Sequence, residues 1–488
     1  MEKKRMSMNR KNKMIRLMSA SLVLASALSL AGCSNDFSRY ENYNEEVSAV
    51  SSLQPVDTVL NTESYAGEAA TVEETMETFA SKDGLCVIEK KPSYYEVYLD
   101  YSNGDYYKVG KAYAETIMKI DLDFAGVLEP FLYENIKMAF PSIYGEYSPV
   151  IDRINTLMAS LPEDYRREME GFAEIMSEGR KGFEPDGKMS YEEALIMHLV
   201  PDCLRGTNCN ALSVWGEKTE TGDRITSRTL EWTLGSENQM CTAHAVTHFK
   251  MGNNGEKNNF TTFSVLGQLD VLTGINDKGV FVGILDVGSD NNYVCEGKKC
   301  YTYELRYALE HMNDAKTFGK YMVGESTDFT WSHNLIITDK DYAFCAEDCV
   351  DPGFVNEDGE AEGIAVLRDK DTPLIDGITW DNPDSLCVVN SFVSEGNKDY
   401  LSGSGSNFVR FEKFNTWVKE KDKLSMSDVK DIVTREKNER ESGYQKLHSE
   451  NVFQTIIYDY GTGELNVYFT GTEGVVDHPE YTKISLDK

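Results

Sequence analysis

Basic side chains are in short supply in this sequence. Its 488 residues include 49 Lys and Arg against 81 Asp and Glu, which gives a formal net charge of −32. A polyanion of this kind does not seek nucleic acid or anionic lipid surfaces, so neither is expected as a partner. The sequence also lacks a Cys-x-x-Cys pair and a His-rich cluster, which argues against a zinc site, and we expect no metal and no cofactor. No Gly-x-Ser-x-Gly turn supports a serine triad.

Long apolar runs are absent after residue 32, so no transmembrane helix is expected in the rest of the chain. Near the start, seven basic residues lead into an uncharged, mostly apolar run from Leu17 to Ala31, which has the length of a signal-peptide core. The run ends in Leu30-Ala-Gly-Cys33, which resembles the bacterial lipobox. The resemblance implies that residues 1–32 are a lipoprotein signal peptide and that Cys33 receives a lipid, including a fatty acyl chain such as palmitate.

This interpretation places the protein on the extracytoplasmic face of the cell membrane, held by the lipid anchor alone. The alternative is an ordinary secretory signal with an incidental cysteine. Removal of residues 1–32 takes away seven basic residues and one acidic residue, so the net charge changes from −32 to −38. Of the ten cysteines, Cys295 with Cys300 and Cys345 with Cys349 are the closest neighbours, but spacing alone does not decide whether any of them form disulfides.

The composition changes in three steps after the signal. Residues 33–84 are rich in Ser, Thr, Glu and Asn without a sustained period, which predicts a flexible acidic stalk. In residues 85–208, Tyr94–Tyr101 alternates like a strand and the rest shows mainly helical periodicity. Ser190-Tyr-Glu-Glu193 resembles a capping box that opens a helix. Residues 209–488 alternate like strands with a few helices between them. A helical segment followed by a strand-rich one predicts an α+β fold.

The segment around Cys209 places a cysteine at the start of a predicted hairpin whose second strand carries an arginine and an acid. Ala211–Trp215 and Arg224–Trp232 alternate like two strands around the turn Thr221-Gly-Asp223, which predicts a hairpin. The second strand contains Arg228-Thr-Leu-Glu231-Trp. This arrangement resembles the start of the catalytic chain in cysteine N-terminal-nucleophile hydrolases, above all the penicillin acyltransferase-like (acyl-CoA:6-aminopenicillanic acid acyltransferase) family. Choloylglycine hydrolases and acid ceramidases are more distant relatives.

Further segments continue this resemblance in chain order. Leu161–Ala173 is similar to the helix upstream of the family's nucleophile, and Thr273–Val280 is similar to its Gly-Met-Asn-Glu-Lys-Gly-Leu turn. Val389-Asn390-Ser-Phe stands where Thr-Asn-His-Phe is expected, and Arg410 follows where an arginine opens the next helix. The resemblance covers roughly residues 95–475. It implies a four-layer αββα N-terminal-nucleophile hydrolase sandwich with a helical N-terminal segment, the catalytic domain being residues 209–488.

The resemblance also implies roles for individual residues. Self-cleavage between Asn208 and Cys209 would free the Cys209 α-amine, whose ordinary pKa of about 8 lets it take the thiol proton without a histidine. Arg228 would favour the thiolate from the neighbouring strand. Glu231 would orient the amine by hydrogen bonding, and Asn390 with backbone N–H groups would hold the oxyanion.

Several residues depart from the family pattern. Glu231 replaces an aspartate and so reaches one methylene further, Thr229 replaces an asparagine, and Asn208 stands where glycine is commoner. Asp286 stands where choloylglycine-type relatives place an oxyanion asparagine, and a charge there opposes an anion. We nevertheless assign Asp286, together with Arg410, to substrate binding.

The sequence therefore predicts a self-processing surface lipoprotein that hydrolyses, or transfers the acyl group of, a linear amide bond in a small N-acyl substrate. The two fragments are expected to stay associated after the cut. The other hypothesis is a binding lipoprotein that keeps the fold without the chemistry. Under this hypothesis the same side chains have structural roles. Cys209 is then a buried structural cysteine, Arg228 an outward-facing strand residue and Glu231 a solvated edge acid. Asn390 is a turn former, and Arg410 is a helix-surface or ion-pair residue.

Overall fold

The computed structural model describes residues 69–143, 145–204, 208–252, 256–288, 293–325, 329–350, 364–395, 397, 405–435 and 445–486. The predicted signal peptide, the lipid-attachment residue Cys33 and most of the predicted stalk lie outside these residues. Within them, no helix combines the length and the apolar character needed to cross a membrane.

The larger sheet of the described residues has ten strands and is antiparallel except at one junction. In sheet order its strands are β1 (Glu77–Ala80), β2 (Cys86–Lys90), β3 (Tyr95–Asp100), β6 (His244–Lys250), β7 (Phe260–Val265), β8 (Thr273–Asn276), β9 (Phe281–Asp286), β10 (His333–Thr338), β11 (Ala343–Cys349) and β12 (Ile364–Arg368). The exception is the parallel pairing of β3 with β6, which joins the N-terminal segment to the strand-rich part of the chain.

The smaller sheet carries the predicted hairpin near its centre. In sheet order its strands are β13 (Ser385–Val388), β4 (Asn208–Val214), β5 (Ile225–Glu231), β14 (Val452–Asp459), β15 (Glu464–Phe469) and β16 (Thr482–Ile484). The turn between β4 and β5 includes the short 3-10 helix η2 (Gly216–Lys218). β5 is buried along its whole length, as expected for a central strand that is covered on both faces.

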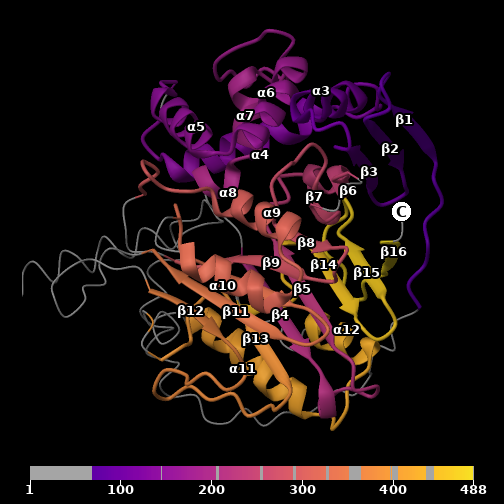
Figure 1. Ribbon diagram of the computed structural model, residues 1–488, viewed down its shortest axis with the longest axis vertical. Helices are drawn as coiled ribbons and strands as arrows, with labels where there is room; N and C mark the ends of the chain where they lie inside the picture. Colours follow the sequence, from indigo (N-terminus) through magenta and orange to yellow (C-terminus); the bar gives the residue numbers. More distant parts are fainter. Residues whose placement is uncertain are drawn as a thin grey trace, which may run out of the picture.

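Helices cover the outer face of each sheet, so this part of the molecule has four layers (Figure 1). α9 (Tyr301–His311) and α10 (Ala315–Glu325) pack on the larger sheet, and α11 (Gly405–Lys419) and α12 (Met426–Thr434) pack on the smaller one. Side chains alternate between two cores, because Ala211 on β4 belongs to the core between the sheets and Leu212 to the core under α11 and α12. The predicted α+β fold with an αββα sandwich is confirmed.

The N-terminal helices form a cap at the top of Figure 1. They are α3 (Tyr106–Ile117), α4 (Phe124–Ala139), α5 (Ser148–Ser160), α6 (Glu163–Ser177), α7 (Tyr191–Met197) and α8 (Val200–Cys203), and a 3-10 helix, η3 (Gln239–Ala243), precedes β6. The predicted capping box of Ser190 and Glu193 opens α7. α3 and α6 touch through their backbones, because a Cβ atom at Gly110 would lie 2.0 Å from the Glu168 carbonyl oxygen.

The N-terminal boundary differs from the predicted one. The sequence predicts a stalk up to residue 84, yet β1 lies inside that range and pairs with β2, and Thr71 bridges to Thr482. In the segment 85–208, predicted as mainly helical, the strand predicted at Tyr94–Tyr101 is confirmed as β3, and β2 is an additional strand. Both strands continue the larger sheet. β1 is an edge strand of sequence Glu-Thr-Phe-Ala in which only Phe79 is half-buried, so it shows no apolar alternation in the sequence. The folded body therefore includes residues from position 69 onward.

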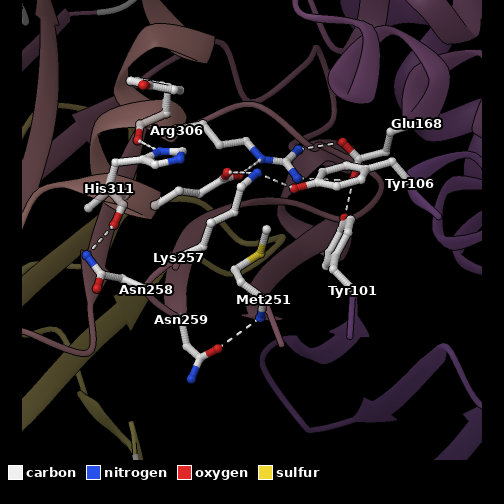
Figure 2. Close-up of polar contacts among 12 residues, drawn as sticks. Tyr101, Tyr106, Glu168, Met251, Lys257, Asn258, Asn259, Arg306 and His311 are labelled. Atoms are coloured by element: carbon white, nitrogen blue, oxygen red, sulfur yellow. Dashed lines mark hydrogen bonds and ion pairs between the residues drawn. The ribbon is translucent and has the colours of Figure 1, made fainter. Parts of the chain in front are cut away.

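A buried ion-pair cluster joins the N-terminal helices to the strand-rich part of the chain (Figure 2). The Arg306 guanidinium on α9 donates to the Glu168 carboxylate on α6, with Nη2 3.2 Å from Oε1, and both side chains are fully buried. The Tyr101 hydroxyl donates to the same carboxylate. Arg306 Nε also lies 3.2 Å from Glu310 Oε1. Lys257 Nζ lies 2.8 Å from the other carboxylate oxygen of Glu310. A chain cut between α8 and β4 would keep these contacts and the β3–β6 pairing.

Arg306→Met is expected to lower the free energy of unfolding by about 3–5 kcal/mol, because it removes the cation between two buried carboxylates, those of Glu168 and Glu310. The matched control is Lys111→Met, which removes the partially exposed partner of Glu174 and is expected to cost about 1 kcal/mol or less. Urea unfolding followed by circular dichroism measures both values. Equal, small losses in the two variants would show that the cluster does not hold the helical cap in place.

Candidate active site

Cys209 lies near the start of β4 and faces the larger sheet. Arg228 on β5 stands opposite Ala211, two residues after Cys209, so the register puts the cysteine and the arginine on the same face of the hairpin. Arg228 Nη2 donates to Cys209 Sγ at 3.1 Å and to the Ile284 carbonyl oxygen at 2.8 Å. Gly283 on β9 leaves room for this arginine, because a Cβ atom there would lie 2.6 Å from Arg228 Cγ.

Burial and charge act on the Cys209 thiol in opposite directions. The side chain is fully buried. Burial raises the pKa of the Cys209 thiol, and the Arg228 guanidinium opposes that rise. Burial likewise lowers the pKa of Arg228, while negative charge on Cys209, Asp286 and Glu231 raises it. Arg228 is the positive charge in contact with the sulfur, so a thiolate at this position depends on it.

The Cys209 nitrogen faces the side-chain amide of Asn390. Its N–H donates to Asn390 Oδ1 at 2.8 Å, and Asn390 Nδ2 donates to the Asp286 carbonyl oxygen at 2.7 Å. Asn334 on β10 fixes the chain around Asn390. Asn334 Nδ2 donates at 2.9 Å to the carbonyl oxygens of the two residues that flank Asn390. In the intact chain Asn390 Oδ1 therefore accepts from the Cys209 N–H, and the role of Asn390 as an oxyanion donor stays a prediction.

Glu231 ends β5 and is buried, so the alternative of a solvated edge acid is wrong. One of its carboxylate oxygens contacts the Arg410 guanidinium on α11, and the other accepts from the Ser449 hydroxyl. Arg410 Nη1 also lies 3.4 Å from Asn390 Oδ1. Arg410 is therefore a buried ion-pair residue that contacts both the Glu231 carboxylate and Asn390 Oδ1. Its contact with a substrate stays a prediction.

Asp286 ends β9 on the facing sheet. Its Oδ1 accepts from the Tyr301 hydroxyl at 3.0 Å, and its carbonyl oxygen accepts from Asn390 as described. Burial is the larger cause of the raised pKa of Cys209, and the Asp286 charge adds to it. The Asp286 charge thus disfavours a thiolate at Cys209, and its effect on a substrate oxyanion stays a prediction.

A second charged pair lies next to Asp286. His333 has no acidic neighbour in the sequence, but the antiparallel register places Asp348 opposite it, with Nε2 and Oδ2 3.2 Å apart. Burial lowers the pKa of His333, yet the contact with Asp348 outweighs burial and the pKa is raised overall. The ring stacks on Tyr301 with centroids 4.5 Å apart. The charge of Asp286, which lies opposite His333 on β9, also raises the pKa of His333.

No protein-family model and no curated protein sequence matches the chain. Among solved structures it is similar to a Caenorhabditis elegans ortholog of N-acylethanolamine-hydrolyzing acid amidase, with 11% identity, a TM-score of 0.35, and coverage of 52% of this chain and 93% of that one. It is also similar to penicillin V acylase from Agrobacterium tumefaciens, with 12% identity, a TM-score of 0.34, and coverage of 57% and 87%.

A third similar structure is a variant of the conjugated bile acid hydrolase from Clostridium perfringens, with 11% identity, a TM-score of 0.32, and coverage of 57% of this chain and 98% of that one. With TM-scores below 0.5, these likenesses say nothing about which residues react. The chemistry of the site rests on the contacts of this chain.

The structure brings together six residues that the sequence singles out, namely Cys209, Arg228, Glu231, Asp286, Asn390 and Arg410, with Asp286 in contact through its carbonyl oxygen. Asn208 is the first residue of β4, and its side chain lies outside the described part. Sequence reasoning missed Ser449, Asn334 and Tyr301. No spacing relative to Cys209 marks them, because they come from the segment before β14, from β10 and from α9 and meet only in the fold.

No disulfide joins any two of the nine cysteines in the described part, which are Cys86, Cys203, Cys209, Cys241, Cys295, Cys300, Cys345, Cys349 and Cys387. Neither pair suggested by spacing is bonded. Burial raises the pKa of Cys86, Cys203 and Cys345 to about 12. Among the described residues, no disulfide therefore joins the part before Asn208 to the part after it.

Asp202 on α8 lies six residues before Asn208 and is fully buried. Its carboxylate accepts from the Tyr301 N–H at 2.7 Å and from the Thr302 hydroxyl, and burial raises its pKa to about 7. The ordinary pKa of an aspartate is about 4, so the folded state binds the proton more tightly than the unfolded state. The resulting stabilisation is complete below about pH 4 and is lost as the pH rises through about 7.

Asp202→Asn is expected to remove this pH dependence, since an amide stays neutral at every pH. The wild-type free energy of unfolding should fall by about 2–4 kcal/mol more than that of the variant between about pH 4 and pH 8. Denaturant unfolding at several pH values measures the difference. Parallel pH profiles for the two proteins would show that Asp202 ionises normally in the fold.

Proposed function

We propose that this chain is a self-processing amidohydrolase whose nucleophile is Cys209, made N-terminal by a cut after Asn208. The observation that supports this most strongly is the pair of contacts at Cys209: a buried arginine lies 3.1 Å from its sulfur, and an amide oxygen lies 2.8 Å from its nitrogen. An N-terminal nucleophile needs both a cation that favours the thiolate and polar groups that orient the amine.

The first step in this proposal is the cut in the chain itself. Cys209 Sγ attacks the carbonyl carbon of Asn208, the C–N bond breaks, and the Cys209 nitrogen takes a proton to become the α-amine. Water then hydrolyses the thioester, which leaves a carboxylate on Asn208 and restores the thiol. Cys209 is fully buried in the intact chain, so the cut is also expected to open the nucleophile to substrate.

Turnover of a small N-acyl amide uses the same atoms. The α-amine takes the thiol proton, Sγ attacks the amide carbonyl carbon, and Asn390 Nδ2 and backbone N–H groups hold the oxyanion, which is worth about 3–4 kcal/mol per donor. Collapse of the intermediate expels the amine, which receives its proton from the Cys209 α-ammonium. Water then hydrolyses the acyl-enzyme, or a second amine accepts the acyl group.

The export features place this chemistry outside the cytoplasm in our proposal. A lipid on Cys33 would anchor the N-terminal fragment to the membrane, whereas the fragment that begins at Cys209 would carry the active site. The contacts of Glu168 with Arg306 and the pairing of β3 with β6 would hold the second fragment to the first. No metal or cofactor is required by the steps above.

The second candidate function is binding without turnover. It is favoured by Asp286, whose charge adds to the rise in the pKa of the Cys209 thiol that burial causes, and by the departures at Asn208 and Glu231. Iodoacetamide labelling near neutral pH separates the two functions. An activated Cys209 in cleaved protein should react faster than the other thiols, whereas uniform, slow labelling would favour the binding protein.

A panel of N-acyl amides with product detection by mass spectrometry, run on the cleaved protein, tests the proposed activity. The panel covers bile-acid conjugates, N-acyl amino acids, acylated signals, β-lactams and peptidoglycan fragments. The proposal predicts release of a free amine and a carboxylic acid from at least one linear amide. Hydroxylamine in a parallel reaction reports acyl transfer, since it converts an acyl-enzyme to a hydroxamate. An uncut wild-type chain that still hydrolyses an N-acyl amide would contradict the mechanism.

A further inference from the structure

Glu231 is held from two sides by residues that are far apart in the sequence. Arg410 on α11 contacts Oε2, and Ser449, just before β14, contacts Oε1. Ser449 is buried, with 2% of its surface exposed. Glutamate carries one more rotatable bond than the aspartate that the family resemblance implies, so its carboxylate needs more than one partner to keep a single position.

The direction of the Ser449 hydroxyl is set by its surroundings. The Asn451 N–H donates to Ser449 Oγ at 3.2 Å, so that oxygen acts as acceptor there and its own hydrogen is left for Glu231. The Trp232 N–H donates at 2.9 Å to the Asn451 carbonyl oxygen, which ties this turn to the end of β5. β14 then begins opposite Glu231 with a shift in register after Val452, a feature that re-aims side chains next to sites.

We propose that Ser449 is a positioning residue for the amine of Cys209. The Ser449 hydroxyl donates to Glu231 Oε1 while Arg410 binds Oε2. The two contacts together keep the carboxylate in a position where the freed α-amine can donate to it. This role rests on the proposed function, because the amine exists only after the cut. It also accounts for the tolerance of glutamate at position 231, since Ser449 and Arg410 together restrain the longer side chain.

Ser449→Ala tests the role in the cleaved enzyme, with the N-acyl amide that the panel identifies. We expect kcat to fall about tenfold, the usual effect of one lost hydrogen bond to a charged group, with KM unchanged. Ser449→Thr keeps the donor and should restore kcat, and Ser449→Cys, a weak donor of similar size, should resemble alanine. Ser213→Ala is the matched control, because Ser213 is a fully buried serine on β4 whose hydroxyl bonds Thr226.

A double-mutant cycle with Glu231→Asp separates positioning from general stability. Aspartate is one methylene shorter and is expected to lose the contact with Ser449, so the tenfold effect of Ser449→Ala on kcat should disappear in that background. If the effects of Ser449→Ala and Glu231→Asp on kcat multiply in full, or if Ser449→Ala leaves kcat unchanged, the positioning role of Ser449 is wrong. The proposed function still holds in that case as long as the wild-type protein turns over its substrate. A cleaved wild-type protein with no turnover and no fast Cys209 labelling overturns both.

Discussion

Cys209→Ala is expected to yield a single uncut chain without measurable amidase activity, while the wild-type protein yields two fragments that meet at Asn208 and Cys209. In the proposed mechanism, the variant lacks the sulfur that attacks both the backbone of the chain and the substrate. The expected loss of turnover is therefore about 10⁴-fold or more. Intact-mass spectrometry measures the cut, and amine release from an N-acyl amide measures the activity. Alanine is smaller than the buried cysteine, so the fold should be retained at a cost of about 1–2 kcal/mol.

Cys345→Ala is the matched control for this experiment. Cys345 on β11 is also fully buried, and burial raises its pKa to about 12 although Arg368 lies beside it. It thus shares the cysteine–arginine pairing of the candidate site but stands in mid-strand. We expect Cys345→Ala to be cut and active. A cut Cys209→Ala chain, or an uncut Cys345→Ala chain, would show that the nucleophile is misassigned.

Arg228→Leu is expected to slow both the cut and turnover by about 100-fold. Arg228 opposes the rise that burial causes in the pKa of Cys209, so its removal raises that pKa further. Each unit of increase lowers the thiolate fraction at neutral pH about tenfold. The rate of iodoacetamide labelling of Cys209 should fall in step with turnover, and its pH dependence should move to higher pH. Labelling rates measured from about pH 6 to pH 10 test this directly.

Arg224→Leu controls for the loss of a buried arginine close to Arg228 in the sequence. Arg224 is buried just before β5, donates to Ser213 Oγ at 3.1 Å and stacks on Trp215. Its loss should lower stability without changing the labelling rate of Cys209. Equal effects of the two leucine variants on labelling would mean that Arg228 acts through the fold and not through the sulfur.

The hairpin could be predicted because its information is local. Both strands alternate around a turn that contains Gly222, and β4 and β5 occupy the predicted ranges with differences only at their ends. Their register then follows from the turn, which places Arg228 on the same face as Cys209. The helix of the capping box at Ser190 was equally local, and it forms as predicted.

The surroundings of Cys209 could not be predicted in the same way. Glu231 is restrained by Arg410 and Ser449, and the three meet only because α11 and the start of β14 fold onto the end of β5. Likewise, Asp348 reaches His333 through cross-strand register and not through sequence spacing. Long-range contacts of this kind leave no period or motif in the chain.

The most direct test of the proposed mechanism is to trap the acyl-enzyme on cleaved wild-type protein with an N-acyl amide. The reaction is quenched in acid, and the peptides are mapped by mass spectrometry. The proposed mechanism predicts a peptide that begins at Cys209, carries a free α-amine and has gained the mass of the acyl group on its sulfur. Acyl mass on any other residue, or an acylated peptide that still runs through the bond between Asn208 and Cys209, would contradict it.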